Sequence, residues 1–310
     1  MSIMDKLHLA VLLSAANELY KYGKMISFTK IHERMNNMAT FYVDNAYKRY
    51  EKNPFDNDKP YDESWILLKL IEEADDFQMM TTGGKNQVFR FIITKKAKCW
   101  QFRVMDFIQY EMAYGKNIIL AVNENDLTLS QSEYGEHTYN DCFLRDYEEK
   151  VLVHTTTKEN YCKIISSGTL KSWNILKNEN RDWEEHPIGA IIGDPANYSN
   201  YIMFGTGGYY QEIIPLSKQK GHIEMDVDCI YTAGARLYFS AEHIAKDGLL
   251  IRDGAHLKVK DRLSISDYLL WTATPEAIGI SEQTTPRIFA ETSDRIFTEK
   301  FNIPLEDTCY

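Results

Sequence analysis

The chain has 310 residues and a formal net charge of −10, with 44% hydrophobic and 26% charged residues. This length suits one large domain or two modest ones, and no apolar run approaches the roughly 18 residues that a membrane helix needs. The net acidity argues against a large non-specific footprint on duplex nucleic acid, because contacts to phosphates require a basic face, but it allows recognition of one or two nucleotides in a pocket.

The cysteines and the first residues bear on the cellular compartment. The five cysteines are odd in number and form no CxxC pair, which is typical neither of a disulfide framework nor of a zinc ribbon. The opening MSIMDKLHLAVLL has no convincing cleavage site, so we interpret it as a helix rather than a signal peptide. We therefore expect a cytoplasmic protein with free thiols, no membrane segment and no bound metal.

The first part of the chain is predicted to be mainly helical. Apolar residues recur at helical spacing from Leu7 to Leu19, and further helices are predicted over about 30–38, 40–50 and 63–76. The polar, proline-containing segment before the last of these predicts a loop. Gly83 and Gly84 predict a turn, followed by a strand over 87–94.

An amphipathic stretch over 100–114, a strand over 117–122 and a polar run over 123–141 complete this part. We place a domain boundary in the polar run, near residue 145. Residues 1–145 are then a mainly helical accessory domain that docks a target or an inhibitor, or simply covers the second domain. A winged helix-turn-helix is a less favoured alternative.

From residue 149 onward, short apolar runs alternate with glycine-bearing turns, which predicts an α+β domain over residues 146–310. A strand over 151–153 is followed by His154 and Thr156, which point to the same face, and a helix over 160–166 ends at Gly168. Polar side chains at a strand end beside a helix are typical of a ligand cleft. The alternative for His154 is a side chain satisfied by its own loop.

Four segments of this second part together resemble a known enzyme family. The segment VLVHTTTKENYCKIISSGTL, with H-x-T before a helix that closes in G-x-L, resembles the first NAD-contacting segment of ADP-ribosyltransferases. The run DPANYSNYIMF is similar to an aromatic run of the DarT family, toxins that ADP-ribosylate bases in DNA. LYFSAEHIAKDGLLIRDGAH resembles a further DarT-family stretch that ends in T-D-G-H-A, with the small residue and the histidine in reversed order here. TPEAIGI, in which a glutamate is predicted to open an apolar strand, resembles the family's A-E-x-L-V context.

The resemblance covers roughly residues 148–305 and implies an ADP-ribosyltransferase-like split β-sheet with NAD⁺ as co-substrate. It implies that Glu276 is the catalytic carboxylate, which stabilises the oxocarbenium-like state and could take a proton from a base nitrogen. Glu282, in a predicted loop, and Glu291, in a possible strand, are the rival carboxylates. The cofactor-binding residues that it implies are His154, Thr156, Tyr201, Phe204, Tyr238 and Ser240, with Tyr201 or Tyr238 stacking on nicotinamide.

One departure from the family is an arginine that should follow the aromatic run. The matching segment Phe204-Gly205-Thr206-Gly207-Gly208 has none, and Arg236, Arg252 or Arg262 are the candidates to supply the cation. This absence supports a non-enzymatic binding module as an alternative.

The segment over 256–274 is predicted to face the acceptor. Lys258, Lys260 and Arg262 near Trp271 suit a nucleic-acid strand, although a solvated loop with Trp271 in the core fits equally well. The resemblance predicts a bacterial toxin or antiphage effector that modifies a base of single-stranded RNA or DNA, with an antitoxin protein as a candidate partner. A protein acceptor, or an RNA 2′-phosphotransferase-like reaction, is the alternative.

Overall fold

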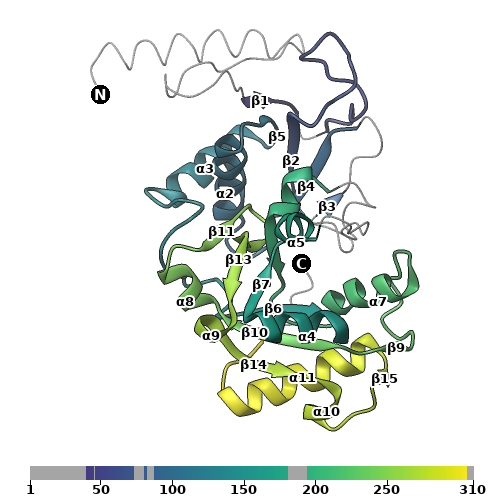
Figure 1. Ribbon diagram of the computed structural model, residues 1–310. Coiled ribbons are helices and arrows are strands. Elements are labelled where there is room, and N and C mark those ends of the chain that lie inside the picture. The colour runs from purple at the N-terminus through teal and green to yellow at the C-terminus, as the bar shows by residue number, and fades with distance from the viewer. Residues whose placement is uncertain (1–39, 45, 73–79, 82–86, 181–193, 306–310) are drawn as a thin grey trace.

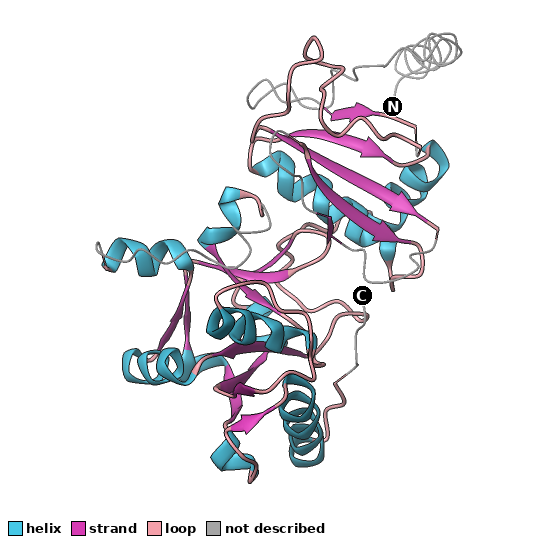
Figure 2. Cartoon of the chain, turned by 90° about the vertical axis from the view of Figure 1, so that its right-hand side faces the viewer, coloured by secondary structure: helices cyan, strands magenta, loops and turns pink. Residues whose placement is uncertain are grey.

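The computed structural model describes residues 40–44, 46–72, 80–81, 87–180 and 194–305. These residues form two successive halves, a parallel sheet with two helices and then a set of smaller sheets and helices (Figures 1 and 2). The helices expected over 7–19 and 30–38 and the turn at Gly83 and Gly84 lie outside the described residues. No helix of the described part of the chain is long and apolar enough to cross a membrane.

The first half is built on a five-stranded sheet in the order β1-β5-β2-β4-β3. The pairs β1–β5, β5–β2 and β2–β4 are parallel, and β3 runs antiparallel to β4 at one edge. Its elements are β1 (Thr40–Tyr42), β2 (Trp65–Ile71), β3 (Met80–Thr81), β4 (Phe89–Thr94), α2 (Trp100–Ala113), β5 (Asn117–Ala121) and α3 (Glu124–Tyr134).

The predicted helices over 40–50 and 63–76 are wrong. The first is β1 followed by a loop, and the second contains β2, whose Leu67 and Leu68 are both fully buried. Neighbouring residues of a strand point to opposite faces, and an inner strand of a parallel sheet is buried on both. Such a strand has an unbroken apolar sequence that helical periodicity also fits. Over its described residues the first half is therefore α/β and not mainly helical.

Helices α2 and α3 lie along one face of this sheet (Figure 1). The amphipathic stretch over 100–114 is confirmed as α2, and the strands expected over 87–94 and 117–122 are confirmed as β4 and β5. The polar run after β5 contains α3, where Asn123 caps the first turn by accepting a hydrogen bond from the Asp126 amide at 2.8 Å. The opposite face is covered by aromatic side chains of the loop before β2, including Tyr47, Tyr50 and Phe55.

The second half mixes helices with several small sheets, which is compatible with the predicted α+β class. Two three-stranded sheets have the orders β14-β10-β6 and β11-β12-β8, and the pairs β13–β7 and β15–β9 complete the strands. The two larger sheets meet at a single bridge, where Val153 and Gly205 exchange backbone hydrogen bonds of 2.7 and 2.9 Å. The strands are β6 (Val151–Thr156), β7 (Thr169–Lys171), β8 (Tyr201–Phe204), β9 (Tyr231–Thr232), β10 (Ala235–Ser240), β11 (Leu250–Arg252), β12 (Leu257–Lys260), β13 (Arg262–Ser264), β14 (Leu269–Ala273) and β15 (Gln283–Thr284).

The helices of this half pack around those sheets. The helix predicted over 160–166 is confirmed within α4, which Thr157 caps and which Gly168 ends in the left-handed conformation, with a φ of 66°. The helical elements are α4 (Lys158–Ser167), α5 (Trp173–Glu179), η1 (Ala196–Asn200), η2 (Tyr210–Glu212), α7 (Ile213–Lys220), α8 (Ala241–Lys246), α9 (Ile265–Tyr268), α10 (Pro275–Ile278) and α11 (Pro286–Phe301).

Candidate functional site

His154 lies inside strand β6, which continues to Thr156 instead of ending at residue 153. Its imidazole is half-buried, and Nδ1 lies 3.3 Å from the backbone carbonyl of Met203 in β8. A carbonyl oxygen only accepts, so Nδ1 carries the proton of this hydrogen bond. Burial lowers the pKa of His154, which keeps the ring neutral near pH 7. Nε2 is then a hydrogen-bond acceptor that can bind a ligand hydroxyl.

Thr156 closes β6 on the same face as His154. The Thr156 carbonyl lies so near Gly234 that a Cβ on Gly234 would approach it to 2.1 Å. On the other face, the Thr155 hydroxyl donates a 2.8 Å hydrogen bond to the Gln211 carbonyl. The end of β6 is therefore held between the start of β10 and the segment after β8.

A glycine-rich segment, residues 205–208, follows β8 and lies beside this end of β6. A Cβ on Gly205 would overlap the side chain of Gln211, at 1.6 Å from its Nε2 atom. The same Nε2 donates to the Gly207 carbonyl at 2.9 Å, whereas the buried Oε1 atom of Gln211 has no hydrogen-bond partner. Gly207 and Gly208 have φ values of 142° and 75°, which side chains rarely allow. Gln211 was not predicted from the sequence, although the spacing of the glycines indicates the tight backbone that surrounds it.

Glu276 is exposed and lies in the first turn of α10, so the prediction that it opens a strand is wrong. Thr274 caps this helix and Pro275 takes its first position, which is a recognised helix start. Lys158, the first residue of α4, has its pKa raised mainly by its hydrogen bond to Glu282, and Glu276 contributes to the rise. Both carboxylates therefore act on the charge of Lys158 at the start of α4, with Glu282 in direct contact. Glu291 is exposed on α11 and not in a strand.

Tyr238 is not accessible for stacking on a ligand. Its side chain is 0% exposed, and its ring stacks on Phe297 with centroids 4.5 Å apart and an interplanar angle of 9°. Its hydroxyl donates a 2.7 Å hydrogen bond to Asp294. The predicted cofactor role of Tyr238 is therefore wrong, because core side chains already pack against its ring.

The other cofactor-binding candidates divide into two groups. Phe204 lies near His154, with ring centroids 6.1 Å apart. Ser240 pairs with Val151 at the opposite end of β6 and caps α8 by accepting a hydrogen bond from the His243 amide. Tyr201 is buried. The structure brings Phe204 and Thr156 to His154 but gives Ser240 and Tyr201 structural positions.

Lys258 is also buried, at 0% exposure, so its predicted contact with an acceptor strand is wrong. Its ammonium group donates to Asp253 and faces the rings of Tyr110, Tyr201 and Tyr198, at 3.9, 4.6 and 4.7 Å from their centroids. Burial lowers the pKa of Lys258, while Asp253 opposes the shift.

Lys260 and Arg262 remain exposed. The Arg262 guanidinium lies 2.6 Å from a carboxylate oxygen of Glu179.

Two of the three candidates for the missing family arginine form buried ion pairs within the fold. Arg236 is fully buried and binds Asp294 through Nε and Nη2, each at 2.8 Å, and Glu212 through Nη1 at 3.1 Å. Arg252 is buried in an ion pair with Glu148. Arg262 is the exposed member of the three.

Comparisons with protein-family models, curated proteins and solved structures gave no match to this chain.

Proposed function

We propose that the second half binds NAD⁺ beside His154 and transfers its ADP-ribose to a base of single-stranded RNA or DNA. The observation that carries this proposal is the neutral imidazole at the junction of the two larger sheets. Its Nε2 atom has no hydrogen-bond partner among the described residues, and Phe204 lies beside the ring, with centroids 6.1 Å apart. A hydrogen-bond acceptor beside an aromatic ring suits a hydroxyl group of a ribose. The acceptor class follows from the resemblance of the sequence.

In the proposed reaction, the bond between the ribose C1′ and the nicotinamide nitrogen breaks and its electron pair stays on nicotinamide. A nucleophilic nitrogen of the acceptor base forms the new bond to C1′ and releases a proton. Glu276 stabilises the positive charge that develops on the ribose and accepts that proton. His154 positions the ribose and takes no part in proton transfer.

A nucleotide-binding module without transfer is the second candidate function. It is favoured by the burial of Arg236 and Arg252 in ion pairs, which leaves neither guanidinium to assist the transfer step. The exposed position of Glu276 on a four-residue helix also favours it.

Incubation with NAD⁺ labelled in its adenylate part, together with separate pools of DNA, RNA and protein, tests the proposal. We expect label in one nucleic-acid pool, and at least ~100-fold less with Glu276→Gln, the scale of losing one electrostatic stabiliser of a transition state. Glu242→Gln, at an exposed glutamate in the first turn of α8, is the matched control. NAD⁺ binding by calorimetry without any labelled product indicates the binding module. Absence of both binding and product overturns both functions.

A further inference from the structure

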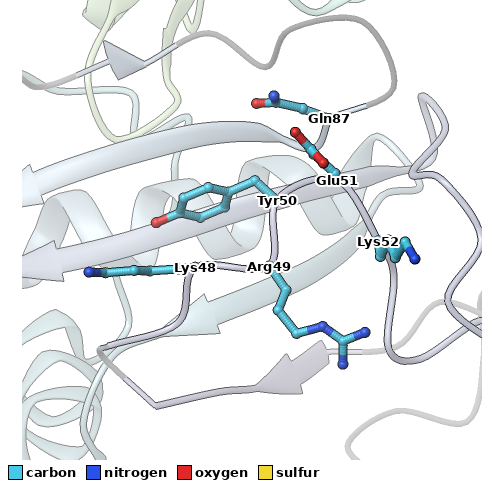
Figure 3. Close-up of a pocket in the computed structure, with 6 residues that line it drawn as sticks. All are labelled: Lys48, Arg49, Tyr50, Glu51, Lys52 and Gln87. Carbon is cyan, nitrogen blue, oxygen red and sulfur yellow. The ribbon is translucent and has the colours of Figure 1, made fainter.

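A pocket of about 390 Å³ lies in the first half, outside the region that carries the resemblance. The residues that line it are Lys48, Arg49, Tyr50, Glu51, Lys52 and Gln87 (Figure 3). All but Gln87 are consecutive in the loop between β1 and β2.

Hydrogen bonds fix the backbone of this loop. The Val88 amide donates to the Tyr50 carbonyl at 2.9 Å, which ties the loop to the residue before β4. The hydroxyls of Tyr47 and Tyr50 donate to the carbonyls of Arg49 and Tyr47, at 2.8 and 3.0 Å. The Arg90 guanidinium lies 4.0 Å from the Tyr50 ring centroid and supports that ring. The lining side chains therefore project from a preorganised backbone.

The charge of the pocket is unusual for a chain with a formal net charge of −10. Lys48 and Lys52 are exposed and have no ion pair among the described residues, while Arg49 pairs with Asp58. Glu51 is the one acidic residue of the lining. Lys48 and Lys52 extend to opposite sides in Figure 3. Two unneutralised cations at separate ends suit an extended chain of phosphates better than a single phosphate ion.

We propose that this pocket binds a single strand of nucleic acid, with Lys48 and Lys52 contacting different phosphates of its backbone. Tyr50 lies between the two lysines in sequence, and its packing against Arg90 and the sheet fixes the backbone that carries them. A duplex needs a broader basic face than this acidic chain provides. The inference does not depend on the transferase activity, because it concerns binding in the absence of NAD⁺.

Fluorescence anisotropy with the full chain and short labelled single strands, at several salt concentrations and without NAD⁺, tests the pocket. In Lys48→Gln/Lys52→Gln, we expect weaker binding on all strand sequences and a salt slope that is lower by about 1.4, since each phosphate contact on a single strand contributes about 0.7. Lys220→Gln/Lys246→Gln is the matched control, because it removes the same charge from two exposed lysines of the second half. Thermal unfolding confirms that both variants are folded.

Equal affinity and equal salt slope for the two double variants would overturn the proposal. Failure of the unchanged protein to bind any single strand would do the same, as would a preference for duplex. Strand binding that depends on Lys48 and Lys52, found in a protein that transfers no label from NAD⁺, would support this inference and contradict the proposed enzymatic function.

Discussion

Glu111 of α2 is a buried carboxylate with an incomplete set of hydrogen bonds. It is 1% exposed, and its Oε2 atom has no hydrogen-bond partner. Burial raises the pKa of Glu111 to about 7, and the charge of Lys258 opposes part of the shift. The buried hydroxyls of Tyr198 and Tyr201 also have no partner. These groups surround the contact between α2 and β12, where the fold tolerates unsatisfied polar atoms.

Glu111→Gln is expected to stabilise the protein at alkaline pH. Because the folded state holds the proton more tightly than the unfolded state, wild-type stability falls as the pH rises from the ordinary glutamate range to about 7. Glutamine removes this ionisation, so the variant gains up to about 3 kcal/mol at about pH 8 and little at about pH 4. Urea denaturation at both pH values measures the difference. An equal effect of the substitution at the two pH values would contradict the assignment.

His154→Ala is expected to weaken NAD⁺ binding by about 1–3 kcal/mol, the cost of a hydrogen bond lost from a buried ligand group. In the unchanged protein, affinity should fall as the pH drops below the ordinary histidine range, because the pKa of His154 is lowered and protonation removes the Nε2 acceptor. Calorimetry measures both effects, with His243→Ala at an exposed histidine as the control. Unchanged affinity in folded His154→Ala would exclude the positioning role.

At the scale of the elements, β2 shows how packing decides between helix and strand. Leu67 and Leu68 lie on opposite faces of β2, against the loop aromatics and against α2 respectively, and each is fully buried. An amphipathic helix over the same residues would expose one side of this apolar run. The loop aromatics supply the second buried face, and the parallel strands β4 and β5 flank β2 within the sheet.

Both Leu67→Ala and Leu68→Ala are expected to cost about 2–5 kcal/mol, because each leaves a cavity in a different core cluster. Lys69→Ala, at the half-buried position that follows them, is the control and should have a small effect. The free energies of unfolding come from urea titration. A large loss of stability for only one of the two substitutions would indicate that β2 is tightly packed on one face only.

At the scale of the whole molecule, a cluster of buried polar contacts lies at the expected boundary, and hydrogen bonds of Arg252 join the halves there. Arg145 binds Asp106 of α2 through Nη1 and Nη2 at 2.7 and 2.9 Å and the Thr138 carbonyl at 2.8 Å. Arg252 donates to the carbonyls of Asp141 and Phe143, at 3.2 and 2.9 Å. The chain around residue 145 is therefore part of a packed polar cluster and not an exposed linker.

A fragment that begins at Asp146 is expected to aggregate, or to unfold well below the full chain. It lacks the carbonyls that bind Arg252 and the Tyr110 ring that covers the buried Lys258. Differential scanning calorimetry and light scattering compare the two proteins. A soluble fragment with the melting temperature of the full chain would show that the second half is an independent domain, with its boundary near residue 145.

Arg145→Met tests the same cluster in the intact chain. It leaves the Asp106 carboxylate buried without its partner, which costs about 3–5 kcal/mol. Arg295→Met, at an exposed arginine whose partner is also exposed, is the control and should change stability little. Urea denaturation of both variants measures the two costs. A cost no larger than that of the control would mean that Arg145 contributes little to holding the boundary segment against α2.

The sequence by itself determined those helices and strands that are specified by patterns of a few neighbouring residues. The strands β4 and β5 and the helices α2 and α4 were predicted, because alternation, helical spacing and the glycine that ends α4 act within a few residues. The shared face of His154 and Thr156 also followed from the period of a strand.

Only the tertiary structure decided which of the polar candidates are buried. Lys258 and Arg236 resemble surface cations in the sequence, but Asp253 and Tyr110 enclose the first, while Asp294 and Glu212 bind the second. Tyr238 is likewise covered by Phe297. Most of these partners lie far away along the chain, and a charge or an aromatic ring is buried only when they come together. Local periodicity carries no information about such contacts. Only the fold therefore showed that His154 remains a candidate site residue, whereas Lys258, Arg236 and Tyr238 have structural roles.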